Sequence, residues 1–176
     1  MSDEAAEFQA IAESVERGDD PYVVPQELID EPEDGKPINK SLYNQILHMS
    51  VGERIKLALK GNREARAILI RDANRLIQNF VLQNPRITDD EIAMLARNRN
   101  TDAELLRKIG DHRLWPRNYQ VRLALVTNPK TPMATAMHFV GSLQERDIRL
   151  LAKSKNVSST VSSQAKRILF QREGHR

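Results

Sequence analysis

Basic side chains recur immediately before predicted helix starts, where they could bind an anionic partner. Arg86 lies in "NPRIT", Arg99 in "NRNT", Lys130 in "NPKT" and Lys155 in "SKNVS". If successive helical segments stack regularly, equivalent turns fall along one edge and bring these cations into a row. Such a row would attract carboxylates or phosphates, and added salt would weaken the attraction. The alternative is structural, since cations near helix C-termini stabilise each helix by about 0.3 to 1 kcal/mol.

The stretch "GDHRLWPRNY", residues 110–119, holds the only tryptophan, Trp115, between Arg113 and Arg117. Tryptophan beside arginine is typical of interface hot spots, and an insertion between repeats often lies on the binding face. Alternatively, Trp115 fills the junction between repeats and Pro116 begins the next helix. An exposed indole would favour contact with a partner. With Arg97 at a predicted helix end, the candidate partner-binding set is Arg86, Arg97, Arg99, Arg113, Trp115, Arg117, Lys130 and Lys155.

The sequence contains no motif that would assemble a catalytic, metal or cofactor site. Cysteine is absent, which excludes disulfides, thiolate zinc sites and cysteine nucleophiles. The histidines at positions 48, 112, 138 and 175 lack the spacing of metal ligands. The serines of "SKNVSSTVSS" have no base nearby in the sequence, and neither "GSLQERD" nor "LKGNREA" fits a phosphate-binding loop. We therefore expect a protein that is not an enzyme and that binds no cofactor or metal.

Explicit start and stop signals delimit short helices from about residue 40 onward. Four segments fit the capping box, in which a hydroxyl accepts from the N3 amide and a carboxylate accepts from the cap amide. Their ends are Ser50 and Glu53, Thr88 and Glu91, Thr101 and Glu104, and Ser142 and Glu145. Thr131 before Pro132 predicts a further N-cap. The prolines of "QNPR" and "TNPK" stop helices, and three glycines suit left-handed C-caps: Gly61, Gly110 and Gly141.

The predicted helices, of about 8 to 12 residues, are too short to be stable alone and must bury apolar stripes on their neighbours. Their starts recur, because Thr101 and Thr131 are 30 residues apart and Thr131 and Ser158 are 27 apart. Helical units that repeat at this period stack into a quasi-linear array. We therefore predict an all-α fold, an α-solenoid of short stacked helices, with an acidic N-terminal arm.

Charge divides the chain sharply. Residues 1–36 hold 12 Asp or Glu against 2 basic residues, whereas the remainder holds 25 Lys or Arg against 12 acids. The prolines and carboxylates of "DDPYVVPQELIDEPEDGKP" predict an extended linker. Residues 3–17 have the pattern of an amphipathic helix, either a partly ordered tail or a helix that docks in a groove. We expect two parts, an acidic arm over residues 1–38 and an α-helical repeat domain over residues 39–176.

The amino terminus, "MSDEAAEFQA", is acidic where a signal peptide would be basic and then apolar. No apolar run approaches the ~18 residues of a membrane span. These features predict a cytoplasmic protein that does not act on membranes.

The segment "VRLALVTNPKTPMATAMHFV", residues 121–140, resembles a leucine-rich-repeat-variant unit and, more broadly, the helix pairs of HEAT-like solenoids. The likeness extends over residues 62–170. It implies a right-handed superhelix in which one helix of each pair is 3₁₀ or irregular. It also implies that Arg66 and Arg122, at matching positions of "NREARAIL" and "NYQVRLAL", bond carbonyl groups of the preceding turn. One member type carries a cysteine-ligated iron–sulfur cluster, for which this chain has no ligands.

Two functions fit these patterns, and HEAT-like relatives include both protein scaffolds and DNA-binding repair proteins. In the first, a non-catalytic scaffold or adaptor holds an acidic or amphipathic segment of a partner protein on its basic edge. In the second, the basic body binds DNA or RNA phosphates with little sequence readout. We favour the first, because the basic part lacks the aromatic platforms that single-stranded nucleic acid usually requires. In either case the acidic arm is expected to dock on the basic body and mask it until a partner displaces it.

Overall fold

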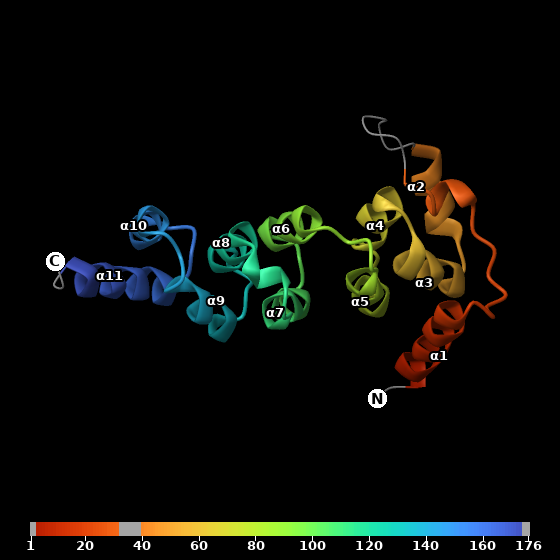
Figure 1. The fold of residues 1–176 in the computed structure, drawn as a ribbon, viewed down its shortest axis with the longest axis horizontal. Helices are drawn as coiled ribbons and strands as arrows, with labels where there is room; N and C mark the ends of the chain where they lie inside the picture. Colours follow the sequence, from red (N-terminus) through yellow and green to blue (C-terminus); the bar gives the residue numbers. More distant parts are fainter. Residues whose placement is uncertain (1–2, 32–39, 174–176) are drawn as a thin grey trace. The chain divides into compact units, whose positions relative to one another are not determined.

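The computed structural model describes residues 3–31 and 40–173, and within these ranges the protein is all-α, as predicted. Eleven α-helices and two short 3₁₀ helices pack against their neighbours, and the described ranges contain no strand (Figure 1). The chain divides between Ile87 and Thr88 into two compact units, called unit 1 and unit 2 below. The predicted boundary between residues 38 and 39 lies outside the described residues.

Unit 1 has its core between the first helix and the helices that follow the acidic segment. Its elements are α1 (Asp3–Arg17), η1 (Gln26–Leu28), α2 (Lys40–His48), α3 (Val51–Lys60), α4 (Arg63–Leu69) and α5 (Arg75–Gln83). The helix predicted over residues 3–17 is present, and its buried face, Phe8, Ala12 and Val15, packs on α3. Of the two alternatives for this helix, the described residues therefore show a docked helix rather than a tail.

Unit 2 consists of three consecutive helical hairpins, whose first helices begin at residues 89, 119 and 145. The elements are α6 (Asp89–Arg97), α7 (Ala103–Asp111), η2 (Trp115–Arg117), α8 (Tyr119–Thr127), α9 (Met133–Val140), α10 (Glu145–Lys153) and α11 (Ser159–Glu173). Each helix buries one apolar stripe, as its length requires. Both members of every hairpin are α-helical, which corrects the expectation that one of each pair is 3₁₀ or irregular.

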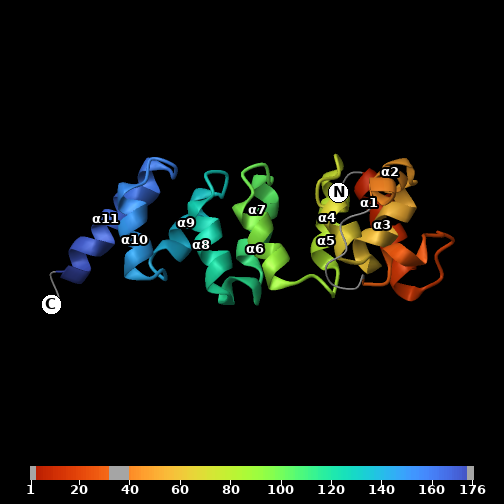
Figure 2. The same ribbon diagram turned by 90° about the horizontal axis from the view of Figure 1, so that it is seen from above.

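The hairpin topology sorts the connections of unit 2 between two ends. The turns at 98–102, 128–132 and 154–158 lie at one end, and the loops at 112–118 and 141–144 lie at the other (Figure 2). The cationic residues predicted to align, Arg99, Lys130 and Lys155, therefore share an end, because each follows the first helix of a hairpin. Arg86 belongs to unit 1.

Helix starts follow the predicted caps in half of the capping-box cases. Ser50 with Glu53 and Thr88 with Glu91 form complete capping boxes. Thr101 and Ser142 form no capping box, because α7 and α10 begin later than predicted. Instead, the Thr101 hydroxyl donates to the carbonyl of Leu95, and the Ser142 hydroxyl donates to that of Phe139. Other starts also shift: α7 is capped by Asp102, α8 by Asn118 rather than beginning at Pro116, and α9 follows Pro132.

The predicted left-handed glycine caps are wrong. Gly61 has φ −64° and Gly141 φ −70°, while Gly110 lies inside α7. Gly61 and Gly110 serve close packing instead, since a Cβ would stand 2.3 Å from the Leu57 carbonyl oxygen in one case and 2.3 Å from Thr135 Cγ2 in the other. The first helices of the three hairpins of unit 2, α6, α8 and α10, each end at a C-cap residue with extended backbone.

Of the helices in the described ranges, none combines the length and apolar character that crossing a membrane would need.

A candidate peptide-binding groove in unit 2

Buried asparagines at the ends of α5 and α8 bond the ends of α3 and α6, respectively. Asn128 is 5% exposed, and its Nδ2 donates to the carbonyls of Ala96 at 2.8 Å and Asn98 at 3.0 Å, at the end of α6. Its Oδ1 accepts from the amide of Lys130 at 2.9 Å, which forms the turn. In unit 1, Asn84 makes the same three contacts to Ala58, Gly61 and Arg86. Each asparagine thus fixes its own turn and clamps the end of the preceding parallel helix.

Ser154 occupies the corresponding position at the end of α10. Asn128 and Ser154 are the C-cap residues of α8 and α10, and both have extended backbone. The Ser154 hydroxyl accepts from the amide of Asn156 at 3.1 Å, so it forms the turn as asparagine does. Within the described residues, however, no hydrogen bond joins its side chain to α8. The contact that clamps α6 to α8 therefore has no counterpart between α8 and α10.

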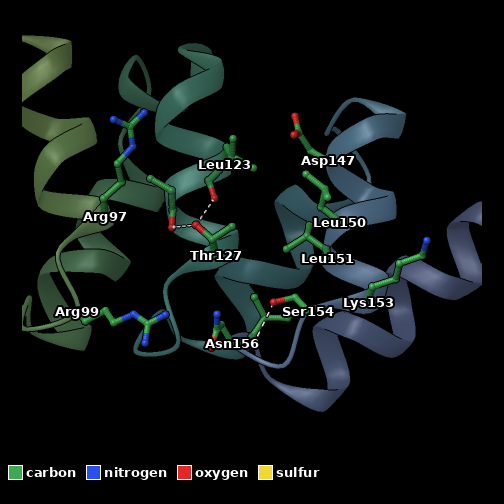
Figure 3. A pocket seen from close by; sticks show the side chains of 12 residues that line it. Arg97, Arg99, Leu123, Thr127, Asp147, Leu150, Leu151, Lys153, Ser154 and Asn156 are labelled. Carbon is green, nitrogen blue, oxygen red and sulfur yellow. Dashed lines mark hydrogen bonds between the residues drawn. The ribbon is translucent and has the colours of Figure 1, made fainter.

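A groove of about 640 Å³ lies between α8 and α10, at the junction that lacks the clamp (Figure 3). Leu123 and Thr127 of α8 and Leu150 and Leu151 of α10 line its two sides. Leu150 is 69% exposed, so most of its side chain is accessible in the groove. The complete lining comprises Arg97, Arg99, Leu123, Ala124, Thr127, Asp147, Leu150, Leu151, Lys153, Ser154, Asn156 and Val157. We call this set the α8–α10 groove.

Cations border the groove on both sides. Arg97 and Arg99 come from the end of α6 and its turn, and Lys153 comes from the end of α10 (Figure 3). Arg97 donates to Oε1 of Gln120 at 2.6 Å. The side chains of Arg99 and Lys153 are exposed and form no hydrogen bond or ion pair with another described residue. Elsewhere in unit 2, Arg107 and Arg149 pair with carboxylates of their own helices. The groove therefore combines an apolar lining with positive charge that the described chain does not neutralise.

Tyr119 makes a contact between α8 and α10 at the ends of these helices opposite the turns. Its hydroxyl donates to the Asp147 carboxylate, which is 8% exposed, and accepts from the amide of Gln144 at 3.2 Å. Burial raises the pKa of Tyr119, and its hydrogen bond to Asp147 acts in the same direction. Because Tyr119 begins α8 and Asp147 lies in the first turn of α10, this contact holds the starts of the two helices together.

The predicted site residues are distributed over four places. Arg97 and Arg99 line the groove, while Lys130 and Lys155 are exposed in turns at the same end of unit 2. Arg113 and Arg117 are exposed in the loop at the opposite end. Arg86, in unit 1, donates to the carbonyls of Ile29, at 2.9 Å, and Lys60. Its guanidinium therefore bonds backbone groups of the protein itself, which was the alternative to binding an anionic partner.

Trp115 is 8% exposed and lies in η2 against α7 and α8, with its ring stacked on His112 at 3.7 Å. It fills a junction within unit 2, which was the alternative to partner contact. The prediction of partner contact required an exposed indole, and the Trp115 indole is buried. Arg122 donates to the carbonyls of Pro116 and Arg117, and Arg66 donates to that of Gly61, so the structural roles expected for both arginines are confirmed.

Unit 1 shows how this chain binds an acidic extended segment. Lys56 pairs with Asp20 at 2.9 Å and donates to the carbonyl of Tyr22 at 2.7 Å. Asn62 donates to two further carbonyls of the segment, and Arg66 pairs with Glu31 at 3.0 Å. Leu28 is fully buried in the core of the unit. Cations, a side-chain amide and an apolar pocket together hold residues 20–31 in place.

The acidic and hydroxyl side chains of the groove bond other groups of the protein. The one acidic side chain of the groove, Asp147, accepts from Tyr119, and the hydroxyls, Thr127 and Ser154, bond backbone groups of their own segments. In the described ranges, no group of three or more His, Asp or Glu is placed to hold a metal ion. Comparisons with family models, curated proteins and solved structures find no match for this chain.

Sequence reasoning missed the asparagine clamps and the apolar lining of the groove. A signal for both exists in the turns, because "TNPK" at 127–130 and "KSKN" at 153–156 align with serine in place of asparagine. The carbonyl partners of Asn128 lie 30 and 32 residues earlier, so the function of the asparagine follows only from the packing of α6 on α8.

Proposed function

We propose that this protein is a non-catalytic scaffold that binds an acidic, partly apolar segment of another protein in the α8–α10 groove. We also propose that its hairpins form an α-solenoid of the HEAT-like or leucine-rich-repeat-variant kind. The regular hairpins of unit 2 and the clamp between α6 and α8 support this architecture, because each hairpin contacts mainly the next one.

The observation that carries the proposal is the combination of exposed leucine and unneutralised cations in one groove. Leu150 and Leu123 offer apolar area, and Arg99 and Lys153 offer charge that has no partner in the described chain. Apolar area supplies affinity, whereas the cations attract and orient carboxylates. The proposed mechanism is docking of a short segment without any bond being made or broken.

A protein partner fits this groove better than a nucleic acid does. Unit 2 holds 16 Lys or Arg against 9 Asp or Glu, a net formal charge that would permit phosphate binding. Base stacking, however, needs exposed aromatic rings. In unit 2, Trp115 and Phe139 are buried, and Tyr119 bonds Asp147. Phe170 of α11 is exposed, but it does not line the groove.

Regulation by the acidic arm remains part of the proposal. Residues 20–31 already bind cations of unit 1, at high effective concentration because they are tethered. Since Phe8, Val15 and Leu28 belong to the core of unit 1, deleting the arm would also damage the fold. Replacing Glu31, the partly exposed carboxylate that pairs with Arg66, with glutamine is a gentler test, and tighter binding of an acidic peptide is expected if the arm masks cations.

Binding of an immobilised peptide panel tests the proposed function. The panel consists of 12-residue peptides, each with one Leu, Ile or Phe and about two to four carboxylates, and of controls with Lys replacing each acid. We expect acidic members to bind in the micromolar range and to weaken as salt rises. The variant Arg99→Glu/Lys153→Glu should lose this binding, whereas Arg113→Glu/Arg117→Glu, at the other end of unit 2, should keep it.

Two results would overturn the proposal: no acidic peptide binds the wild-type protein, or both double variants lose binding equally. Stronger binding of duplex DNA or single-stranded RNA than of any peptide, measured at about 50 mM salt, would favour the nucleic-acid alternative.

A further inference from the structure

The two junctions between parallel helices in unit 2 have different C-cap side chains, Asn128 at one and Ser154 at the other. Asn128 bonds the carbonyls of the last-but-one residue of α6, Ala96, and of its C-cap, Asn98. The corresponding carbonyls at the end of α8 belong to Val126 and Asn128, and the side chain that would have to reach them is that of Ser154. The serine hydroxyl is attached directly to Cβ, whereas the amide nitrogen of asparagine is one carbon further out.

The shorter side chain also lacks the second donor hydrogen. An asparagine amide can bond two carbonyls and still accept the turn amide through its oxygen. A hydroxyl has one hydrogen, and the oxygen of Ser154 already accepts from Asn156. Ser154 therefore preserves the turn but leaves out the connection to the neighbouring helix.

The consequence is a junction that is held at one end only. Tyr119 and Asp147 connect the starts of α8 and α10, while the ends of the two helices flank the groove and have no clamp. In contrast, α6 and α8 pack directly along their length and have the Asn128 clamp. The groove lining reaches the ends of α8 and α10, where the clamp is missing, and includes Arg99 of the turn after α6 and Lys153 at the end of α10.

We infer that Ser154 keeps the α8–α10 groove open, and that the groove accepts one large apolar side chain of the partner's acidic segment between Leu123 and Leu150. The inference rests on the proposed function and specifies its ligand. The 640 Å³ volume suits a few side chains rather than a folded domain. Flanking carboxylates of the ligand pair with Arg99 and Lys153, as Asp20 and Glu31 pair with Lys56 and Arg66 in unit 1.

The decisive substitution is Ser154→Asn, which restores the residue found at the other junction. The asparagine bonds the end of α8, draws α10 toward it and removes the space for the ligand. Affinity for the acidic panel peptides should fall at least about tenfold, the loss expected when one leucine-sized side chain has no pocket. Ser154→Ala removes the hydroxyl without adding a donor and should stay within about twofold of wild type.

A second pair of variants tests the apolar part without touching the clamp. Leu150→Glu places a carboxylate in the groove at an exposed position, so the protein stays folded and should lose affinity for acidic peptides. Leu114→Glu is the matched control, since Leu114 is also exposed but lies in the loop at the opposite end of unit 2. Replacing the apolar residue of a bound panel peptide with alanine should weaken wild-type binding to the same degree as Leu150→Glu.

The outcomes separate this inference from the proposed function. If acidic peptides bind wild type but Ser154→Asn and Leu150→Glu bind them equally well, the inference is wrong while the scaffold proposal stands. If no panel peptide binds wild type, the proposed function itself fails. Circular dichroism and unfolding of each variant show whether a loss of binding reflects the groove or the fold.

Discussion

The α6–α8 and α8–α10 junctions of unit 2 join equivalent helices, yet one is closed and the other contains a groove. The closed junction has a buried asparagine that bonds two carbonyls of the preceding helix, and the open one has Ser154. In both turns, the side-chain oxygen of the C-cap residue accepts a hydrogen bond from the backbone amide two residues later. The comparison shows that a C-cap residue can perform two separable tasks, forming the turn and clamping the neighbouring helix. In our proposal, the loss of the second task alone leaves room for a ligand.

The largest effect is expected from removing the clamp at the closed junction. Asn128→Ala leaves the carbonyls of Ala96 and Asn98 and the amide of Lys130 without this partner, at a cost of about 3 kcal/mol in the free energy of unfolding. Asn128→Asp should cost more, because a carboxylate oxygen would face the two carbonyls. Chemical denaturation measures both values.

Ser154→Ala is the matched control, with an expected loss of no more than about 0.5 kcal/mol at an exposed turn. Equal destabilisation by Asn128→Ala and Ser154→Ala would mean that the two junctions do not differ as described.

A smaller effect is expected at the bond that holds the open junction together. Tyr119→Phe removes one partner of the Asp147 carboxylate and should lower the free energy of unfolding by about 1 to 2 kcal/mol at neutral pH. The pKa of Tyr119 is raised in the folded protein, so its contribution is complete below the ordinary tyrosine pKa of about 10. That contribution is lost as pH rises through the higher folded value.

Unfolding measured between about pH 9 and 11 checks this sign. Wild type should lose stability more steeply than Tyr119→Phe over that range. Parallel curves for the two proteins would show that Tyr119 does not connect α8 and α10.

The smallest effect concerns the cations beside the two junctions. Arg97 crosses the closed junction to Gln120, and Arg97→Ala should cost about 0.5 kcal/mol at this exposed position. Lys153 bonds no other described residue, so Lys153→Ala should leave the free energy of unfolding unchanged and lower affinity for acidic peptides instead. A stability loss for Lys153→Ala as large as that for Arg97→Ala would argue against a cation reserved for a partner.

The helices could largely be predicted from sequence, because their signals are local. Capping boxes at Ser50 and Thr88 depend on residues three positions apart, and the apolar period identifies buried faces such as that of α1. Predictions failed where a tertiary contact competed. Thr101 bonds the Leu95 carbonyl, so the cap passes to Asp102, and Gly110 is needed for the approach of Thr135 rather than for its backbone angles.

The site was only half visible in the sequence for the same reason. Exposed cations at turns can be counted directly, and Arg97 and Arg99 do line the groove. Whether such a cation is available to a partner nevertheless depends on packing. Arg86, in a matching "NPR" turn, donates to the carbonyls of Ile29 and Lys60. Ser154 bonds no group of the helix that lies some 26 to 28 residues earlier, beside the groove. The aligned turns do differ at this residue, but the meaning of the difference follows only from the packing of the helices.

The distance between the ends of α8 and α10 tests the central claim most directly. The chain has no cysteine, so spin labels can be attached at Lys130→Cys and Lys155→Cys across the open junction, and at Arg99→Cys and Lys130→Cys across the closed one. We predict that Ser154→Asn shortens the distance across the open junction and leaves the other unchanged. An unchanged distance between positions 130 and 155, or an equal change in both pairs, would contradict the claim that this side chain holds the groove open.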